Sequence, residues 1–476
     1  MNPKQYIYRH WSIVIILFLL PVMLYAILHI LPTHDDWAGT TKPDFAPFFV
    51  KEHFFFYGYH WRPFDTWIGY IAGRNPQVLY PLFNHILVVA GHVLCSLTVY
   101  KLLAVLGFSR TAQNITTLFF FIAPATMATT TAVDSQNQVY ALTIDIVAFL
   151  AYIKLKKGKY VLWPLLVFLA ALFKENGLMW ALICPILAFG FDFINKKTLK
   201  KDLIAGVMLM MLYALAIVIQ PKDMNIHPEY VPSVLKVITS AVKFLFTSFI
   251  TVDYIWLLHA PSRNLWMAAL TLMLALPFFY VIFVRNVRIV KEKKIVCTLI
   301  ALCIAAAPHV LTVYSMMHTY AGLVMIAIIT AHSITVCQQD IKLVTTAFVL
   351  FVIAAIIIDV HLIDASIKSG LVGKKMAVEA VQKTDQPADR VYVVIIEDAY
   401  PKLSSFCVIP SEAFGWGYAT QYETNYRWPK AIQDTTITRA AHAMSEARKI
   451  CHDKLRHKAA DCAWIVNHQN IYVVTK

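Results

Sequence analysis

Long apolar runs dominate this chain and predict membrane-spanning helices. A helix needs about 20 apolar residues to cross a bilayer, and about 11 runs of this kind follow one another along the sequence. They lie at 11–31, 79–105, 114–130, 137–153, 160–173, 177–194, 203–219, 264–284, 295–314, 320–337 and 343–362. No small-residue cleavage site follows Leu31, so we interpret the first run as a retained helix and not as a signal peptide. The predicted fold class is an α-helical polytopic membrane protein.

The composition supports this interpretation and excludes other classes of protein. Of the 476 residues, 59% are hydrophobic and 15% are charged, whereas soluble domains have about 45–50% and about 25%. A soluble enzyme, a disordered chain and a secreted disulfide scaffold are therefore excluded. Of the 8 cysteines, only Cys407, Cys451 and Cys462 lie in the polar C-terminal part, so at most one disulfide can form there.

Basic clusters between the apolar runs predict the orientation of the chain. The sequence has 42 Lys and Arg against 28 Asp and Glu. Such an excess is ordinary for the cytoplasmic loops of a polytopic protein, so it does not indicate nucleic acid as a partner. The clusters lie at 154–159, 196–201 and 285–294. With about 11 spans and a cytoplasmic N-terminus, all three clusters fall on the cytoplasmic side, as the positive-inside rule requires.

The apolar stretch 234–258 is predicted not to cross the membrane. A single crossing there would place the second and third basic clusters on opposite sides of the membrane. Because Lys236, Lys243 and Asp253 interrupt the stretch, we interpret it as a re-entrant or interfacial helix on the outer face. The segments expected outside are 32–78, 131–136, 174–176, 220–263, 315–319 and 363–476.

The chain is predicted to form two domains, a transmembrane domain at 1–362 and a soluble extracytoplasmic domain at 363–476. The second is polar and combines strand-like runs with one helix-like stretch, which predicts a small α/β fold. The strand-like runs lie at 390–398, 463–468 and 471–476, and the helix-like stretch lies at about 435–458. Its expected place outside the cell makes this domain a candidate module for binding the acceptor or a partner.

The first external loop, 32–78, carries the candidate catalytic residues. Asp35 and Asp36 follow the first predicted helix, in a loop rich in aromatic residues. A carboxylate in dry surroundings can take a proton from an acceptor hydroxyl, because burial raises its basicity. We slightly prefer Asp36, since its neighbour Trp37 could shield the site. The alternative that both carboxylates are solvated turn residues stays open.

Cationic and polar side chains near the same membrane boundary predict an anion-binding site. Arg62 and Lys174 suit a phosphate group, because Arg offers a two-pronged donor and Lys a point charge. His85 and His92 are seven residues apart and share one helical face, and ionisable groups inside a membrane tend to face a cavity. The other candidates are His60, Asn84, Asp134, Glu175, His318 and Tyr320. For these residues, a packed histidine bonded to a carbonyl, a solvated ion pair or an interfacial anchor stays open as an alternative.

The sequence shows no metal-binding signature and requires no cofactor. External carboxylates are nevertheless suitable ligands for a hard divalent cation. A metal ion held by Asp35, Asp36 and Asp134 therefore stays open.

The order of these motifs resembles the polytopic GT-C glycosyltransferase superfamily over about a third of the chain. The branch that it resembles contains the polyprenyl-phosphate-sugar O-mannosyltransferases and their bacterial relatives. Its motifs are an acidic pair, a Tyr-Arg-Pro-Leu-like motif, a helix with Asn and two His, a short turn, a Pro-containing helix end with a polar turn, and a Lys-Glu-x-Gly turn. They lie here at 34–37, 60–64, 84–92, 107–110, 123–136 and 174–177. Two departures are Ala123, where the family has His, and Thr129–Thr131, where it has an acid.

The resemblance implies transfer of a sugar from a polyprenyl-phosphate carrier to a hydroxyl group on the outer face. The acceptor would be a glycan, a glycolipid or a protein, and membrane lipids would surround the enzyme. Asp35 or Asp36 would be the general base of an inverting displacement, while Arg62, Lys174 and His85 would hold the donor phosphate. The tetratricopeptide tail of the eukaryotic branch is missing, which favours the inner (plasma) membrane of a bacterium.

Three other functions stay open. An O-antigen ligase or glycan polymerase would carry its large external loop late in the chain, whereas the polar residues here come early. A transporter or flippase for a lipid-linked glycan would show internal repeats with charges near the midplane. A membrane scaffold with a binding domain would leave the ordered motifs unexplained. Turnover of a polyprenyl-phosphate sugar separates the enzymes from the transporter and the scaffold.

Overall fold

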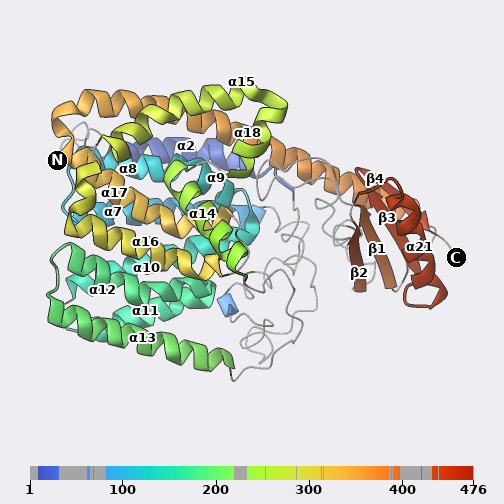
Figure 1. The fold of residues 1–476 in the computed structure, drawn as a ribbon, viewed down its shortest axis with the longest axis horizontal. Helices are drawn as coiled ribbons and strands as arrows, with labels where there is room; N and C mark the ends of the chain where they lie inside the picture. Colours follow the sequence, from blue (N-terminus) through green and yellow to red (C-terminus); the bar gives the residue numbers. More distant parts are fainter. Residues whose placement is uncertain are drawn as a thin grey trace.

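The structure is a computed structural model, and the following description concerns the residues that it describes. These are 9–31, 62–64, 68, 82–155, 157–218, 233–251, 254–285, 287–311, 314, 316–384, 388, 390–396, 420, 431–437 and 439–474. They form a helical bundle and a small sheet domain beyond one end of the bundle (Figure 1).

The bundle is built from long helices joined by short 3₁₀ or π turns. Its first half contains α2 (Trp11–Ile27), α7 (Leu82–Val105), α8 (Arg110–Ile122), α9 (Pro124–Thr130), η1 (Val133–Ser135), α10 (Gln136–Lys154), α11 (Lys159–Phe173), η2 (Glu175–Met179), α12 (Trp180–Gly190) and α13 (Lys196–Val218). Its second half contains α14 (Val234–Ile250), α15 (Tyr254–Phe279), η4 (Tyr280–Val284), η5 (Val287–Lys291), α16 (Lys293–Val310), η6 (Met316–His318), α17 (Thr319–Val336), η7 (Gln338–Asp340) and α18 (Ile341–Gln382).

The apolar runs fold as helices, but the structure does not confirm that about 11 of them cross the membrane. Within the described residues, six helices are long and apolar enough to cross a membrane, and three shorter apolar helices accompany them. The six lie at Phe83–Val105, Lys196–Val218, Leu265–Val284, Lys293–Val310, Met316–Val336 and Gln338–Gln382. The fold is therefore that of a polytopic helical membrane protein, and the count of about 11 spans stays a prediction.

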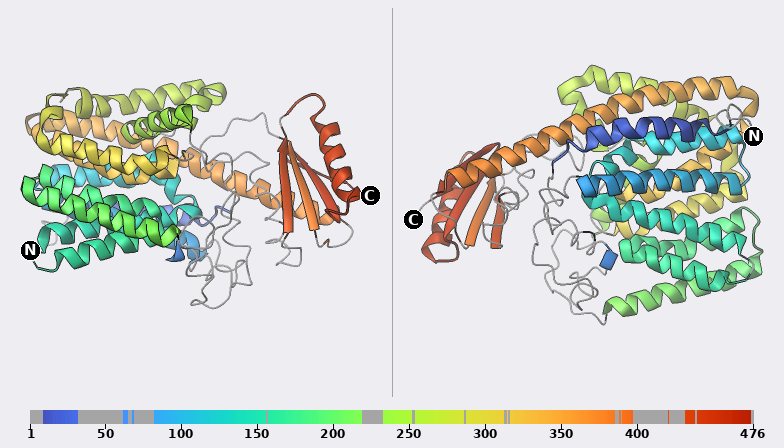
Figure 2. Two further views of the ribbon diagram at one scale, coloured as in Figure 1. Left: turned by 60° about the horizontal axis from the view of Figure 1, so that its bottom comes forward. Right: turned by 180° about the vertical axis from the view of Figure 1, so that it is seen from behind.

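The two ends of the bundle differ in the segments that they carry. The N-terminal part of the chain lies at one end, where α11, α13 and α16 begin, and the sheet domain lies beyond the other (Figures 1 and 2). The three basic clusters lie directly before these helices or in their first turns, so the clusters gather at the end of the bundle where the three helices begin. We call this end the inner end and the opposite one the outer end. The side of a membrane that this end faces stays a prediction.

The prediction of one continuous helix at 114–130 is wrong, because two helices, α8 and α9, cover these residues. Pro124 has no N–H to donate to a carbonyl in the preceding turn, and it forces Ala123 into an extended conformation with φ −60° and ψ 132°. Helix α8 therefore ends at Ile122, and the next helix, α9, starts at Pro124. The free N–H of Ala125 donates instead to the carbonyl of Thr251, at 2.8 Å.

Helix α17 lies at the centre of the bundle. Every residue from Thr319 to Ile334 is buried, and α17 contacts α8, α14 and α16 among other elements. This helix has no polar face, which is the pattern expected for a helix enclosed by others. The stretch expected to be re-entrant contains α14, which packs its buried residues Phe244, Thr247 and Ser248 against this core.

Helix α18 joins the bundle to the sheet domain without a break. Its 42 residues would extend over about 60 Å at 1.5 Å per residue. Phe348 and Phe351 belong to the core of the bundle, whereas Met376 and Ala380 belong to the core of the sheet domain. The expected domain boundary at 362 therefore falls inside a continuous helix.

The sheet domain is an α/β unit, as predicted. Its strands are β1 (Arg390–Ile396), β2 (Ala431–Ile437), β3 (Cys462–Asn467) and β4 (Asn470–Val474), in the order β2-β1-β3-β4. Strand β1 pairs in parallel with β2 and β3, and β4 pairs antiparallel with β3. Helix α18 covers one face and α21 (Ala443–Arg456) covers the other. The helix expected at 435–458 is thus shorter, since its first residues belong to β2.

Cys451 and Cys462 are both buried free thiols on opposite faces of this sheet. Cys451 lies on the buried side of α21, whereas Cys462 lies on β3 and packs against α18. Burial raises the pKa of the Cys451 thiol to about 12, and the nearby Cys462 adds to this rise. Cys407 lies outside the described residues, so the expectation of at most one disulfide stays a prediction.

Candidate active site

Polar side chains from five segments meet at the outer end of the bundle, opposite the basic clusters. We call this group the polar cluster. It consists of Arg62, Gln138, Lys174, Glu175, Asn176, His309 and His318. Arg62 comes from the segment between α2 and α7, Gln138 from the start of α10, residues 174–176 from the turn into η2, His309 from the end of α16, and His318 from η6.

An ion pair between Arg62 and Glu175 forms one side of the cluster. Arg62 Nε donates to Glu175 Oε2 at 2.6 Å, and Arg62 Nη2 donates to Glu175 Oε1 at 2.5 Å. The two parallel hydrogen bonds fix the plane of the guanidinium group. The pair is partly open to solvent, with 17% of the Arg62 and 33% of the Glu175 side chain exposed.

Lys174 places a second cation beside this pair. It ends α11 in an extended conformation and is only 5% exposed. The turn that follows is tight: a Cβ atom on Gly177 would come within 2.9 Å of the backbone of Ala170, so only glycine fits there. The Lys-Glu-Asn-Gly sequence thus brings Lys174, Glu175 and Asn176 together in one rigid turn.

Asn176 connects the turn to a pair of stacked histidines. Its Nδ2 donates to Gln138 Oε1 at 2.8 Å and to His309 Nε2 at 3.2 Å. Because His309 Nε2 accepts a hydrogen bond here, the ring is neutral and carries its proton on Nδ1. The His309 ring stacks on His318, with centroids 4.2 Å apart and an angle of 15° between the planes.

The cluster combines charge with unused hydrogen-bonding capacity. The charges of Arg62, Lys174 and Glu175 lie close enough to both histidines to interact with them electrostatically. Within the described part of the chain, the buried atoms Asn176 Oδ1 and Gln138 Nε2 have no hydrogen-bond partner. Buried polar atoms are normally paired, so this arrangement is typical of a place that receives a polar ligand.

The structure brings together four of the predicted site residues: Arg62, Lys174, Glu175 and His318. It also adds His309, which the sequence analysis did not identify. The only sequence signal for His309 is a histidine directly after Pro308, at the end of an apolar run. The predicted residues Asp35, Asp36 and His60, together with the side chain of Asp134, lie outside the described residues, so their roles stay predictions.

Three other predicted residues make contacts inside the bundle. His85 Nε2 donates to the carbonyl of Ile30, at 3.0 Å. His92 Nε2 donates to the carbonyl of Phe121 at 2.9 Å, and its Nδ1 accepts from the Tyr320 hydroxyl at 2.8 Å. The Phe121 carbonyl lacks a helical partner because α8 ends before Pro124, so it accepts from His92 instead, and Tyr320 in turn bonds the His92 ring.

Asn84 is also buried, and within the described residues its Oδ1 has no partner. No group of three His, Cys, Asp or Glu residues in the described ranges could hold a metal ion. The ligand set considered from the sequence, Asp35, Asp36 and Asp134, is not covered by this statement.

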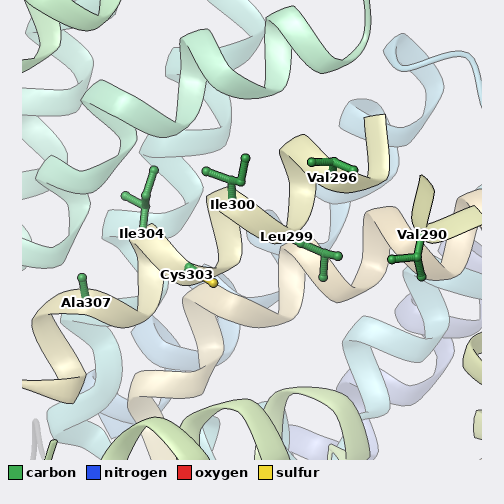
Figure 3. A pocket seen from close by; sticks show the side chains of 7 residues that line it. All are labelled: Val290, Val296, Leu299, Ile300, Cys303, Ile304 and Ala307. Atoms are coloured by element: carbon green, nitrogen blue, oxygen red, sulfur yellow. The ribbon is translucent and has the colours of Figure 1, made fainter. Parts of the chain in front are cut away.

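An apolar groove of about 440 Å³ lies along η5 and α16 (Figure 3). Its lining residues are Val290, Val296, Leu299, Ile300, Cys303, Ile304 and Ala307. None of them has a carboxylate, imidazole or cation, so the groove is not the place of acid–base or phosphate chemistry.

Comparisons with known proteins agree with this picture at the level of the fold. No family model and no curated protein matches the sequence. Among solved structures, the chain is similar to the crystal structure of ArnT from Cupriavidus metallidurans bound to undecaprenyl phosphate. The TM-score is 0.51, the sequence identity is 11%, and the match covers 97% of each chain. At this identity the likeness shows the fold alone, and it agrees with the predicted polytopic helical membrane fold; membership of the GT-C superfamily stays a prediction.

Proposed function

We propose that this protein is a membrane glycosyltransferase that moves a sugar from a polyprenyl-phosphate carrier to a hydroxyl acceptor on the extracytoplasmic face. The observation that carries the proposal is the position of Arg62 and Lys174, two cations held together at the outer end of a GT-C-type bundle. The similar ArnT structure contains undecaprenyl phosphate, which is a ligand of the class proposed here. A lipid tail in the bilayer and an anionic head at its surface suit this place.

In this proposal, the cations bind the phosphate group of the donor. The acceptor oxygen attacks the anomeric carbon, and the bond between that carbon and the phosphate oxygen breaks. Negative charge grows on the departing phosphate, and Arg62 and Lys174 stabilise it. Electrostatic stabilisation of this kind is usually the largest contribution to catalysis at such sites. The neutral His309 and the amide of Asn176 add hydrogen-bonding groups beside the cations.

The acceptor proton needs a base, and Asp36 or Asp35 is our proposal for it. A single displacement by the acceptor inverts the anomeric configuration. The proposed orientation follows the positive-inside rule: the inner end of the bundle, with the N-terminus and the basic clusters, is cytoplasmic, and the sheet domain is outside. The proposed location is the inner membrane of a bacterium.

The test is a transfer assay with the purified protein in lipid and a panel of polyprenyl-phosphate sugars. We expect wild type to release polyprenyl phosphate, and either Asp36→Asn or Asp35→Asn to abolish this release while folding is unchanged. A control is Asp364→Asn on α18, whose carboxylate pairs with Lys368 on the exposed surface. Full turnover in both Asn variants would remove the acidic pair from the mechanism.

A further inference from the structure

Glu175 is the one carboxylate among the described residues of the polar cluster, and its position next to the phosphate-binding cations needs an explanation. A carboxylate repels a phosphate, yet Glu175 occupies two donors of Arg62, at 2.6 and 2.5 Å. The described part of the cluster thus holds two cations, Arg62 and Lys174, against one anion.

The reaction of the proposed function changes the charge of the lipid phosphate. The donor is a phosphodiester with one negative charge. The product is a phosphomonoester, which like other phosphomonoesters carries about −1.5 to −2 at pH 7. Coulomb energy is proportional to the charge of each partner, so unopposed cations would hold the product more tightly than the donor.

We propose that Glu175 is a specificity-determining residue that lowers the affinity of the site for the dianionic product relative to the monoanionic donor. This inference rests on the proposed function. The carboxylate offsets Arg62 through both of its oxygen atoms, so it weakens the attraction of the cations for any phosphate bound beside them. Once the sugar has left, repulsion by Glu175 acts on two negative charges instead of one, and the lipid phosphate is released.

The position of Glu175 fits this role in two ways. One third of its side chain is exposed, so the carboxylate avoids the desolvation cost of a fully buried charge. The tight turn between Lys174 and Gly177 fixes its backbone next to Lys174. Its charge is therefore held within reach of the phosphate throughout the reaction.

The experiment measures the binding of two probes to the full-length protein in lipid nanodiscs: a short-chain polyprenyl phosphate and its methyl phosphodiester. In Glu175→Gln, which keeps the shape and removes the charge, we expect about tenfold tighter binding of the monoester and about threefold tighter binding of the diester. We also expect stronger product inhibition and a lower kcat at an equal or lower KM for the donor. Glu175→Asp should restore the wild-type ratio of the two affinities.

Controls separate this inference from the proposed function and from misfolding. Glu379→Gln, which removes a carboxylate paired with Lys383 in the sheet domain, should leave both affinities unchanged. If both affinities change by the same factor, or neither changes while wild type turns over, the inference about Glu175 is wrong and the proposed function stands. If wild type binds neither probe, both are wrong. If Glu175→Gln fails to fold, Glu175→Asp decides. The inference requires that this variant binds the monoester and the diester with the wild-type ratio of affinities, and a different ratio contradicts it.

Discussion

Two groups of charged residues at opposite ends of the bundle show how a structural ion network differs from a binding site. At the inner end, Lys159 Nζ and the Tyr152 hydroxyl both donate to Asp202 Oδ2, and Asp202 is fully buried. Lys159 also lies over the rings of Tyr152 and Tyr160, 4.5 and 4.7 Å from their centroids. Lys201 Nζ lies 4.6 Å from the centroid of the same Tyr160 ring. The network joins α10, α11 and α13.

The polar cluster at the outer end differs in its exposure. Arg62 and Lys174 lie with the carboxylate of Glu175, and histidines and amides complete the group. In the inner network, 13% of the Lys159 side chain and none of the Asp202 side chain is exposed, so the pair is closed to a ligand. In the polar cluster, 17% of the Arg62 and 33% of the Glu175 side chain is exposed, so a ligand can reach it. On this contrast we propose a structural role for the inner network and ligand binding for the polar cluster.

The largest effect is expected from Arg62. Replacing it by Ala should lower kcat/KM for a polyprenyl-phosphate sugar by about 10²–10³-fold, the usual cost of losing one group that stabilises developing negative charge. Arg62→Lys should restore only part of the activity, because Lys keeps the charge and loses the two-pronged geometry. Steady-state kinetics with equal amounts of folded protein measure this effect, and unchanged kinetics in Arg62→Ala would contradict the assignment.

The inner network should respond to mutation in the opposite way. Asp202→Ala leaves the partly buried charge of Lys159 without its partner, which should cost about 3 kcal/mol of stability. The unfolding temperature of the protein in lipid measures this loss. Activity per folded molecule should stay near that of wild type. A large loss of activity at unchanged stability would show that the two ends do not divide their roles in this way.

His92 offers a smaller test of the same distinction, since we assign it to structure. His92→Phe removes the hydrogen bonds that His92 makes with the Phe121 carbonyl and the Tyr320 hydroxyl, and should cost about 1–3 kcal/mol. Tyr320→Phe removes only one of these hydrogen bonds and should cost about 1 kcal/mol. Thermal unfolding compares the two. A kcat loss without a change in stability would place His92 in the reaction instead.

The smallest effect concerns Cys451, far from both charged groups. Burial raises its pKa in the folded domain to about 12, compared with about 8.5 for a free thiol. The folded state therefore holds the thiol proton more tightly, and its stability should fall as pH rises from about 8.5 towards 12. Unfolding of wild type and Cys451→Ala at pH 7 and pH 10 measures this effect. An identical pH dependence would contradict it.

The sequence predicted the helices better than their interruptions and junctions. Apolar runs indicate helices because each must hide its backbone from lipid. The continuous path of α18 was missed because polar residues such as Asp364 and Lys368 resemble the end of a span. Strand β2 was missed because it is an edge strand, where polar residues such as Thr436 are tolerated.

The candidate site was predictable only in part. Arg62 and Lys174 were found because a cation next to an apolar run has a clear chemical use. Their environment was not predictable, since Arg62 and Glu175 are 113 positions apart in sequence and no local pattern pairs them. His309 was missed for the same reason: a single histidine in an apolar helix gives no sign that Asn176 and His318 contact it.

The most direct test of the central claim compares two lysines of the bundle, Lys174 at the outer end and Lys159 at the inner end. The measurement is the release of polyprenyl phosphate from a polyprenyl-phosphate sugar, normalised to folded protein in lipid. We predict that Lys174→Ala abolishes release while Lys159→Ala retains it at reduced stability. No release by wild type with any donor, or equal losses in the two variants, would contradict the assignment of the polar cluster as the reaction site.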